Sequence, residues 1–203
     1  LMCFEMEGSQ SHSRENEEEH ECENEDEEKL GPVIICVDTS GSMQGSPETV
    51  AKAVTLFMAT RAVSQKRNCF LINFSTKIET MDLSGRIGIT KVIEFLQRSF
   101  HGGTDVSPAL THALKIMENK KYIRSDLIVI SDFLMASVPE SLQDMIRLAK
   151  EKGNRFYSLS IGDIFLDERL EALFDNEWVY NPSDSSIRSV QVIASAMERQ
   201  STG

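Results

Sequence analysis

Largely apolar runs alternate with amphipathic segments along the chain from residue 33 onward. Four runs stand out, VIICV (33–37), CFLINF (69–74), LIVI (127–130) and FYSLSI (156–161). They lack the strict alternation of a half-exposed strand, as is typical of strands buried on both faces of a parallel sheet. The pattern therefore predicts right-handed strand–helix crossovers and an open, doubly wound, Rossmann-like α/β sheet.

Two more strands and six helices complete the predicted pattern. IETMDL (78–83) follows the second run so closely that we expect an antiparallel edge strand there, and WVY (178–180) is the last strand. Ser46-Pro47 and Ser107-Pro108 each predict a capping serine followed by proline at the first helical position. We also expect a short helix at 166–174 and a final helix from Asp184. Four segments carry an apolar stripe at helical spacing: Val50, Ala53, Val54 and Phe57; Ile89, Val92, Ile93 and Leu96; Leu110, Ala113, Leu114 and Met117; and Leu142, Met145, Ile146 and Ala149.

The net charge of −11 is unevenly distributed. Of the 32 acidic residues, twelve lie in residues 1–30 against only Arg14 and Lys29, so the rest of the chain holds 20 acidic and 19 basic residues. We expect residues 1–30 to be an acidic, disordered linker, since they contain too few apolar residues to form a core. Residues 31–200 are predicted to form one domain. No basic run appears, which argues against nucleic-acid binding.

The cysteines and the amino-terminal residues favour a cytoplasmic protein. The four cysteines show no metal-binding spacing or paired framework, and Cys36 and Cys69 fall in apolar strands, where a buried thiol is expected. The first ten residues lack a signal-peptide pattern. No apolar run approaches the roughly 20 residues of a membrane-spanning helix.

Hydroxyl and carboxylate side chains follow the predicted strands where ligands bind in open α/β sheets, at the strands' carboxyl ends. DTSGS (38–42) follows the first run, and Ser131 and Asp132 follow LIVI. The sequence HGGTD places Thr104 and Asp105 on a glycine-rich loop before the helix that starts at Ser107-Pro108. All three segments are expected at the same edge of the sheet.

These side chains share oxygen chemistry that suits a hard cation. Asp38, Ser40, Ser42, Thr104 and Asp132 match the ligand preferences of Mg²⁺, with Mn²⁺ or Ca²⁺ as alternatives. Two carboxylates would leave such a site near neutral, so that it could accept a partner's acidic side chain. Asp105 is expected either to cap the following helix or to stand behind the metal ligands. His101 is expected to be solvated rather than a ligand.

The motifs resemble the von Willebrand factor A (VWA) domain. Asp38, Ser40, Ser42, Thr104 and Asp132 match the metal-ion-dependent adhesion site (MIDAS) of that family position by position. GPVIICVDTSGSM, FSTKIE, FHGGTD and VISDF are similar to the bacterial ViaA and CoxE-like intracellular group. The resemblance implies strand order 3-2-1-4-5-6 with the third strand antiparallel. It also implies a role as adaptor or co-chaperone of a MoxR-type AAA+ ATPase.

Three functions follow as hypotheses. The first is a non-enzymatic, metal-dependent module that binds an Asp or Glu of a protein partner. The second, a Mg²⁺-dependent phosphohydrolase, is disfavoured because Ser40 stands where a general-acid aspartate would be needed, and no candidate basic residue follows the strands. A serine hydrolase is excluded because DTSGS lacks the G-x-S-x-G elbow. The third, an extracellular adhesin of the same fold, is disfavoured by the free cysteines.

Overall fold

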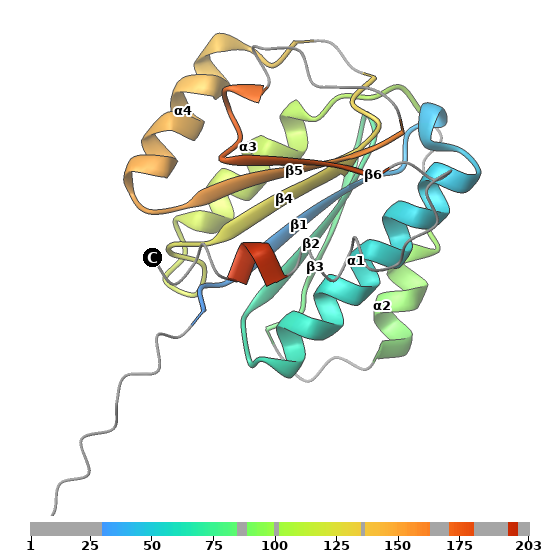
Figure 1. Cartoon of the computed structure of the whole chain (residues 1–203), viewed down its shortest axis with the longest axis horizontal. Helices are drawn as coiled ribbons and strands as arrows, with labels where there is room; N and C mark the ends of the chain where they lie inside the picture. Colours follow the sequence, from blue (N-terminus) through green and yellow to red (C-terminus); the bar gives the residue numbers. More distant parts are fainter. Residues whose placement is uncertain are drawn as a thin grey trace, which may run out of the picture.

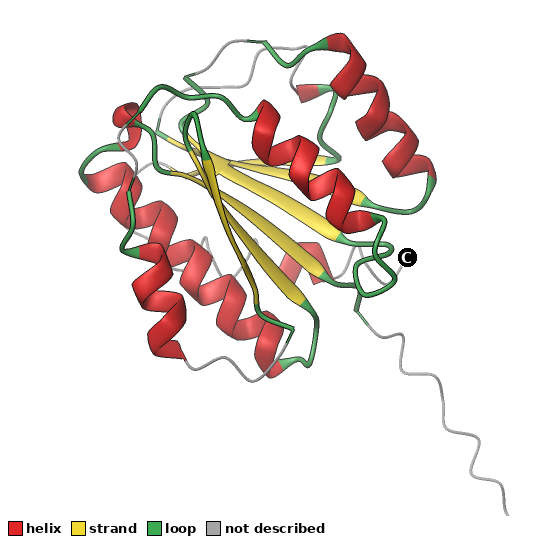
Figure 2. Cartoon of the chain, turned by 180° about the vertical axis from the view of Figure 1, so that it is seen from behind, coloured by secondary structure: helices red, strands yellow, loops and turns green. Residues whose placement is uncertain are grey.

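A computed structural model describes residues 30–84, 89–99, 102–134, 137–162, 171–180 and 195–198, and they form a six-stranded sheet with helices on both faces. Figures 1 and 2 show the sheet between α1 and α2 on one side and α3 and α4 on the other. The strands are β1 Val33–Asp38, β2 Cys69–Phe74, β3 Ile78–Asp82, β4 Asp126–Ser131, β5 Arg155–Ile161 and β6 Asn176–Tyr180. The helices are the 3-10 turn η1 Gly41–Met43, α1 Ser46–Ser64, α2 Ile89–Leu96, α3 Ser107–Met117 and α4 Glu140–Glu151.

The sheet has the order β3-β2-β1-β4-β5-β6, which confirms the predicted architecture. β1 is central, and it pairs in parallel with β2 from Val33↔Cys69 and with β4 from Val33↔Asp126. β3 is antiparallel to β2, with Phe74 opposite Ile78, as the short connection predicts. The carboxyl ends of β1, β2 and β4 therefore lie side by side at one edge, which we call the carboxyl edge.

Alternate residues of β1 divide the apolar core into two layers. Ile34 and Cys36 pack in a cluster that contains residues of α3 and α4, whereas Val33, Ile35 and Val37 pack with residues of α1 and α2. Both faces of the strand are thus buried, which explains why its sequence is a continuous apolar run. Cys36 and Cys69 are buried and free, as predicted, and burial raises the pKa of the Cys69 thiol to about 12.

The predicted helix starts and stripes need correction in places. α1 and α3 begin at Ser46 and Ser107 themselves, and the preceding residues Gly45 and Val106 hold the cap positions. In α1 the buried residues include Ala51, Val54 and Met58, whereas the predicted Ala53 is exposed. Three more predicted stripe residues are exposed: Ile89 and Ile93 of α2 and Met145 of α4.

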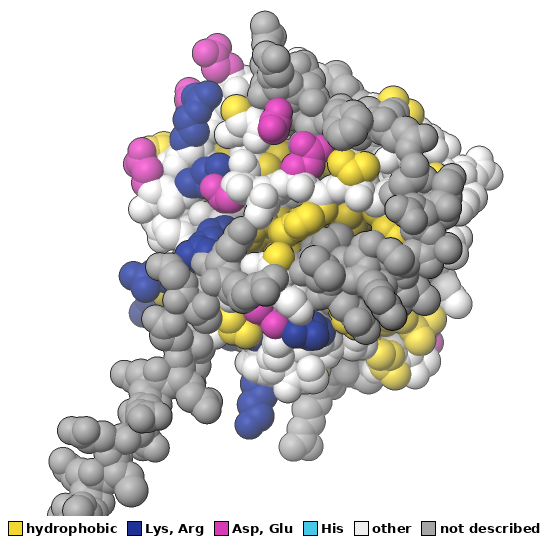
Figure 3. Space-filling view, viewed as in Figure 1, with side chains coloured by type: hydrophobic (Ala, Val, Ile, Leu, Met, Phe, Trp, Pro, Cys, Tyr) yellow, Lys and Arg dark blue, Asp and Glu magenta, His cyan; other side chains and the backbone are white. Residues whose placement is uncertain are grey.

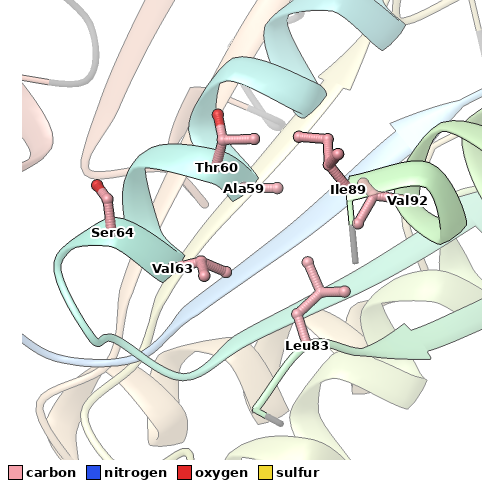
Figure 4. Close-up of a pocket in the computed structure, with 7 residues that line it drawn as sticks. All are labelled: Ala59, Thr60, Val63, Ser64, Leu83, Ile89 and Val92. Carbon is pink, nitrogen blue, oxygen red and sulfur yellow. The ribbon is translucent and has the colours of Figure 1, made fainter. Parts of the chain in front are cut away.

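An apolar groove between α1 and α2 explains the exposure of Ile89. The cavity has a volume of about 280 Å³, and Figure 4 shows Val63, Leu83 and Ile89 directed into it. Because α2 lies toward the β3 edge, one flank of its apolar stripe meets this groove rather than the sheet. The other lining residues are Ala59, Thr60, Ser64 and Val92.

Several predictions fall on residues outside the described ranges. They concern the acidic segment 1–29, His101, most of the short helix at 166–174 and the start of the final helix at Asp184. Residues 195–198 are helical. No helix among the described residues has the length and apolar character needed to cross a membrane.

Candidate metal site

The carboxylate of Asp38, the last residue of β1, is held in place by the turn that follows and by the neighbouring strand β4. It is fully buried, and its Oδ1 accepts the backbone N–H of Ser40 at 2.8 Å. Its Oδ2 accepts a hydrogen bond from the hydroxyl of Ser131, the last residue of β4, at 2.5 Å. Hydrogen bonds to a charged group are among the stronger ones in proteins, so the two bonds fix the orientation of the carboxylate.

The hydroxyl groups of Ser40, Ser42 and Thr104 form a row next to Asp38. Ser40 Oγ lies 3.1 Å from Ser42 Oγ, which in turn lies 3.5 Å from Thr104 Oγ1. The turn η1 brings the serines together, and Met43, fully buried, anchors this turn in the core. The backbone N–H of Gly41 donates to the carbonyl of Gly102 at 2.8 Å, which joins the turn to the loop that carries Thr104.

Asp132 lies on the neighbouring loop, directly after β4. It is buried, and its Oδ1 accepts the backbone N–H of Leu134 at 3.1 Å. Phe133 between them has φ of 53°, and its N–H donates to Ser131 Oγ at 2.9 Å. A positive φ at a bulky residue is rare and is often found at functional sites. Ser131 therefore links the Asp132 loop to the carboxylate of Asp38.

Burial and a neighbouring negative charge make this an electrostatically unfavourable place for an unpaired carboxylate. Burial raises the pKa of Asp38, the hydrogen bonds from Ser131 and Ser40 oppose this rise, and the nearby Asp132 adds to it. None of the ion pairs within the described part of the chain involves Asp38 or Asp132. A bound cation would supply the missing compensation, so the site fits a metal.

The donor set fits a metal that accepts neutral oxygen ligands. In the described ranges there is no group of three or more His, Cys, Asp and Glu side chains placed to bind a metal. A cation here would thus depend on two carboxylates and on the hydroxyls, which favours Mg²⁺ over the thiolate- or imidazole-binding metals.

The residues predicted for the metal site differ in how closely the structure brings them together. Asp38, Ser40, Ser42 and Thr104 form one continuous series of contacts, and Asp132 lies close enough for its charge to affect Asp38. Asp105 is exposed, and its Oδ1 accepts the N–H of Ser107 at 2.9 Å at the start of α3. This contact lies at the amino terminus of α3, where Val106 and not Asp105 holds the cap position.

A buried network below the turn was not predicted from the sequence. Thr39, between Asp38 and Ser40, is fully buried, and its Oγ1 lies 2.6 Å from Asn73 Oδ1 on β2. Asn73 Nδ2 donates to the carbonyl of Arg98, two residues after the end of α2, at 2.8 Å. Asn73 is the one polar residue in the apolar run CFLINF, and that exception was the available signal. The sequence places Ser131 directly before Asp132, but it contains no signal for the bond from Ser131 to Asp38.

The chain belongs to the von Willebrand factor type A domain family, whose profile matches residues 33–134. This range begins with β1 and ends just after Asp132, so it includes all five predicted ligands. The chain is similar to the Regulatory protein ViaA of Edwardsiella ictaluri (strain 93-146), with 33% identity over 162 residues. The similarity covers 79% of this chain and 34% of that protein, so the chain spans about a third of the length of this relative.

Solved structures of low sequence identity share the fold. BatB from Bacteroides thetaiotaomicron, a conserved hypothetical protein, has a TM-score of 0.64 at 18% identity, covering 85% of this chain and all of that one. A von Willebrand factor type A structure from Catenulispora acidiphila has a TM-score of 0.62 at 16% identity, covering 86% of this chain and 42% of that one. These likenesses agree with the fold predicted from the strand–helix pattern.

Proposed function

We propose that the chain is a metal-dependent protein-interaction module in which Asp38, Ser40, Ser42, Thr104 and Asp132 hold Mg²⁺, with Mn²⁺ or Ca²⁺ as alternatives. The observation that carries the proposal is the buried Asp38 next to Asp132, without a basic partner among the described residues, beside a row of three hydroxyls. Membership of the von Willebrand factor type A family supports a role in protein interaction rather than catalysis.

Residues of the protein hold the proposed metal ligands in position. Ser131 and the N–H of Ser40 hold the Asp38 carboxylate, and η1 with the Gly41–Gly102 bond holds the hydroxyls at the same edge. When bound, the metal offers an open coordination position for a carboxylate oxygen. Because two protein carboxylates only balance a divalent charge, an Asp or Glu of the partner would remain attractive to it.

The partner is proposed from the resemblance to ViaA. ViaA is named a regulatory protein. The resemblance of the sequence motifs to the ViaA and CoxE-like group implies a MoxR-type AAA+ ATPase as partner, and we propose that such an ATPase binds this chain in the cytoplasm. The chain would then act as adaptor or co-chaperone and carry out no chemistry of its own.

Metal binding is tested by thermal unfolding of the chain in MgCl₂ and in EDTA. At Mg²⁺ about 100 times its dissociation constant, the melting temperature should rise by about 5–10 °C. The variants Asp38→Asn and Thr104→Ala should lose this rise, whereas Asp144→Asn, on the exposed side of α4, should keep it. A rise of equal size in Asp38→Asn would refute the ligand assignment.

Partner binding is tested separately with a purified MoxR-type ATPase from the same genome. Co-sedimentation or calorimetry should detect a complex in Mg²⁺ that EDTA and Asp38→Asn abolish. Binding unaffected by both would show that the metal is not the recognition element. Metal-dependent release of 4-nitrophenol from its phosphate ester, lost in Asp38→Asn, would instead support the phosphohydrolase.

A further inference from the structure

The edge of the sheet opposite the candidate metal site carries exposed cations. α1, α3 and α4 all end at this edge, and the loops that follow them hold most of its basic side chains. Figure 3 shows Lys and Arg side chains along the left and lower side, with Asp and Glu side chains among them on the upper left; β1 begins at the lower left in Figure 1. We call this surface the basic edge and define it by the exposed residues Lys66, Lys120, Lys121, Arg124 and Lys152.

The three loops of the basic edge touch one another. Asn68 Nδ2, two residues after Lys66, donates to the carbonyl of Lys121 at 3.0 Å. The Arg124 side chain packs over Gly153, since a Cβ built there would lie 3.4 Å from Arg124 Cγ. The cations therefore belong to one continuous surface and not to three separate loops.

The five cations have few opposite charges close to them within the described part of the chain, although the charge of Lys121 acts on the carboxylate of Asp82. None forms an ion pair there, whereas Arg67 and Lys150 at the same edge pair with Asp126 and Asp175. The partial negative charges of the helix carboxyl termini favour cations here, but they amount to about half a charge per helix. Asp175, which pairs with Lys150, is also exposed. Among the described residues, the exposed carboxylates at this edge without an ion pair, Glu118, Glu151 and Asp82, are fewer than the five cations.

Gly31, which follows the acidic segment 15–28 in the sequence, lies in the middle of this surface. The segment contains ten Asp and Glu residues and no Lys or Arg. Arg67 Nε donates to the carbonyl of Gly31 at 2.5 Å. A Cβ at Gly31 would lie 2.4 Å from the carbonyl oxygen of Arg124, so the chain passes tightly between the loops that carry Lys66 and Arg124.

We propose that residues 15–28 bind the basic edge of the same molecule and shield it from other polyanions. A short tether gives the segment a local concentration in the millimolar range. At about 3.4 Å per residue its 14 residues can reach about 48 Å, enough to follow the edge. The contact is electrostatic and is therefore expected to weaken with salt. It lies away from the carboxyl edge and does not depend on the metal.

Cys22, within the segment, allows a direct test on the full chain. In a Cys3→Ser variant a nitroxide label should react with Cys22 alone, because Cys36 and Cys69 are buried. The label should broaden the amide resonances of residues 120, 121 and 152 but not those of residues 42 and 104. The reference is a chain whose ten acids are replaced by Gln and Asn, since connectivity alone brings the label near the edge. Broadening should exceed the reference at low salt and fall to its level in about 0.5 M NaCl.

Charge-reversal variants decide whether the basic edge is the partner. K121E/K152E should reduce the broadening to the reference level, whereas K77E/K91E, with exposed lysines elsewhere, should leave it unchanged. Equal broadening in the acidic and neutral chains, or equal loss in both double variants, would overturn the proposal.

A competition experiment addresses nucleic acid as the alternative occupant. A single-stranded DNA oligonucleotide at low salt should bind the neutral-segment chain at least about tenfold more tightly than the intact chain. Equal affinity for both chains would overturn the proposal, because the segment would not then cover the edge.

Discussion

The arrangement at Asp38 depends on a hydroxyl from another strand. Ser131 Oγ donates to Asp38 Oδ2 and accepts the N–H of Phe133, so one small side chain orients a carboxylate and holds the Asp132 loop. Both bonds are buried, where a lost partner costs more than at the surface. Ser131 is thus a positioning residue behind the candidate ligands.

Ser131→Ala should therefore weaken metal binding without removing a ligand. Loss of such an outer partner commonly costs about 10–100-fold in metal affinity, and we expect about tenfold here. The measurement is a Mg²⁺ titration by calorimetry. Ser158→Ala on β5 is the matched control, because its buried hydroxyl has no hydrogen-bond partner among the described residues. An unchanged dissociation constant in Ser131→Ala would contradict the positioning role.

At the scale of elements, Asn73 connects the turn after β1 to the segment between α2 and α3. Its Oδ1 accepts from Thr39 in the turn, and its Nδ2 donates to the carbonyl of Arg98. The side chain is fully buried at the end of β2. It therefore holds two of the three segments of the candidate site in register.

Asn73→Leu should separate the two segments and lower both stability and metal affinity. The substitution removes the donor of the Arg98 carbonyl and leaves the Thr39 hydroxyl with only the Phe74 carbonyl, at 3.2 Å, as acceptor. This should cost about 1–3 kcal/mol in the free energy of unfolding. Asn154→Leu is the control: its buried amide joins Ser125 and Ala149 at the opposite edge. Urea unfolding should show a similar loss in both variants, and Mg²⁺ titration should show weakened binding in Asn73→Leu only. Equal affinities would disprove the link to the site.

Elements and ligand candidates were predictable to different degrees from the sequence. Apolar runs revealed the strands because both sheet faces are buried, and the polar residues directly after them indicated the carboxyl edge. The side on which a helix packs was less predictable. The apolar stripe that contains Ile89 and Ile93 shows which face of α2 is apolar. It does not show whether another part of the protein covers that face, and both residues are exposed.

Contacts between distant residues could not be predicted from local pattern. The bond from Ser131 to Asp38 spans 93 residues, and the one from Thr39 to Asn73 spans 34. Each depends on strand register, which is settled only when the sheet forms. The five proposed ligands could be named from their residue types and their positions in the loops after the strands. Their metal binding stays a prediction.

At the scale of the whole molecule, Glu198 fastens the last described helical turn to α1. Its carboxylate accepts from Arg61 Nε at 2.5 Å and Nη2 at 2.7 Å, and from Gln65 Nε2 at 2.7 Å. Beside it, Met197 is buried in the cluster that contains β1 and α1 residues. The hydrogen bond from Arg61 is the main cause that lowers the pKa of Glu198.

Glu198→Gln should destabilise the protein by about 1–2 kcal/mol at neutral pH. Because the folded-state pKa is lowered, this stabilisation is complete above the ordinary value of 4.5 and is lost as the pH falls through the folded-state pKa. Urea unfolding of both proteins between pH 7 and 3 should thus show a difference that shrinks below about pH 4.5. A difference that stayed constant over this range would show that the carboxylate charge is not its source.

The central position of β1 has a consequence for synthesis on the ribosome. Its neighbour β4 emerges 93 residues after it, as the span from Asp38 to Ser131 measures. At about 5–20 residues per second, translation leaves one edge of β1 without its partner strand for about 5–20 s. During this interval Asp38 lacks the donor from Ser131, and an apolar strand edge is open to other nascent chains. Pairing with β2 covers only the opposite edge of β1, so the edge that receives β4 stays open until β4 has been synthesised.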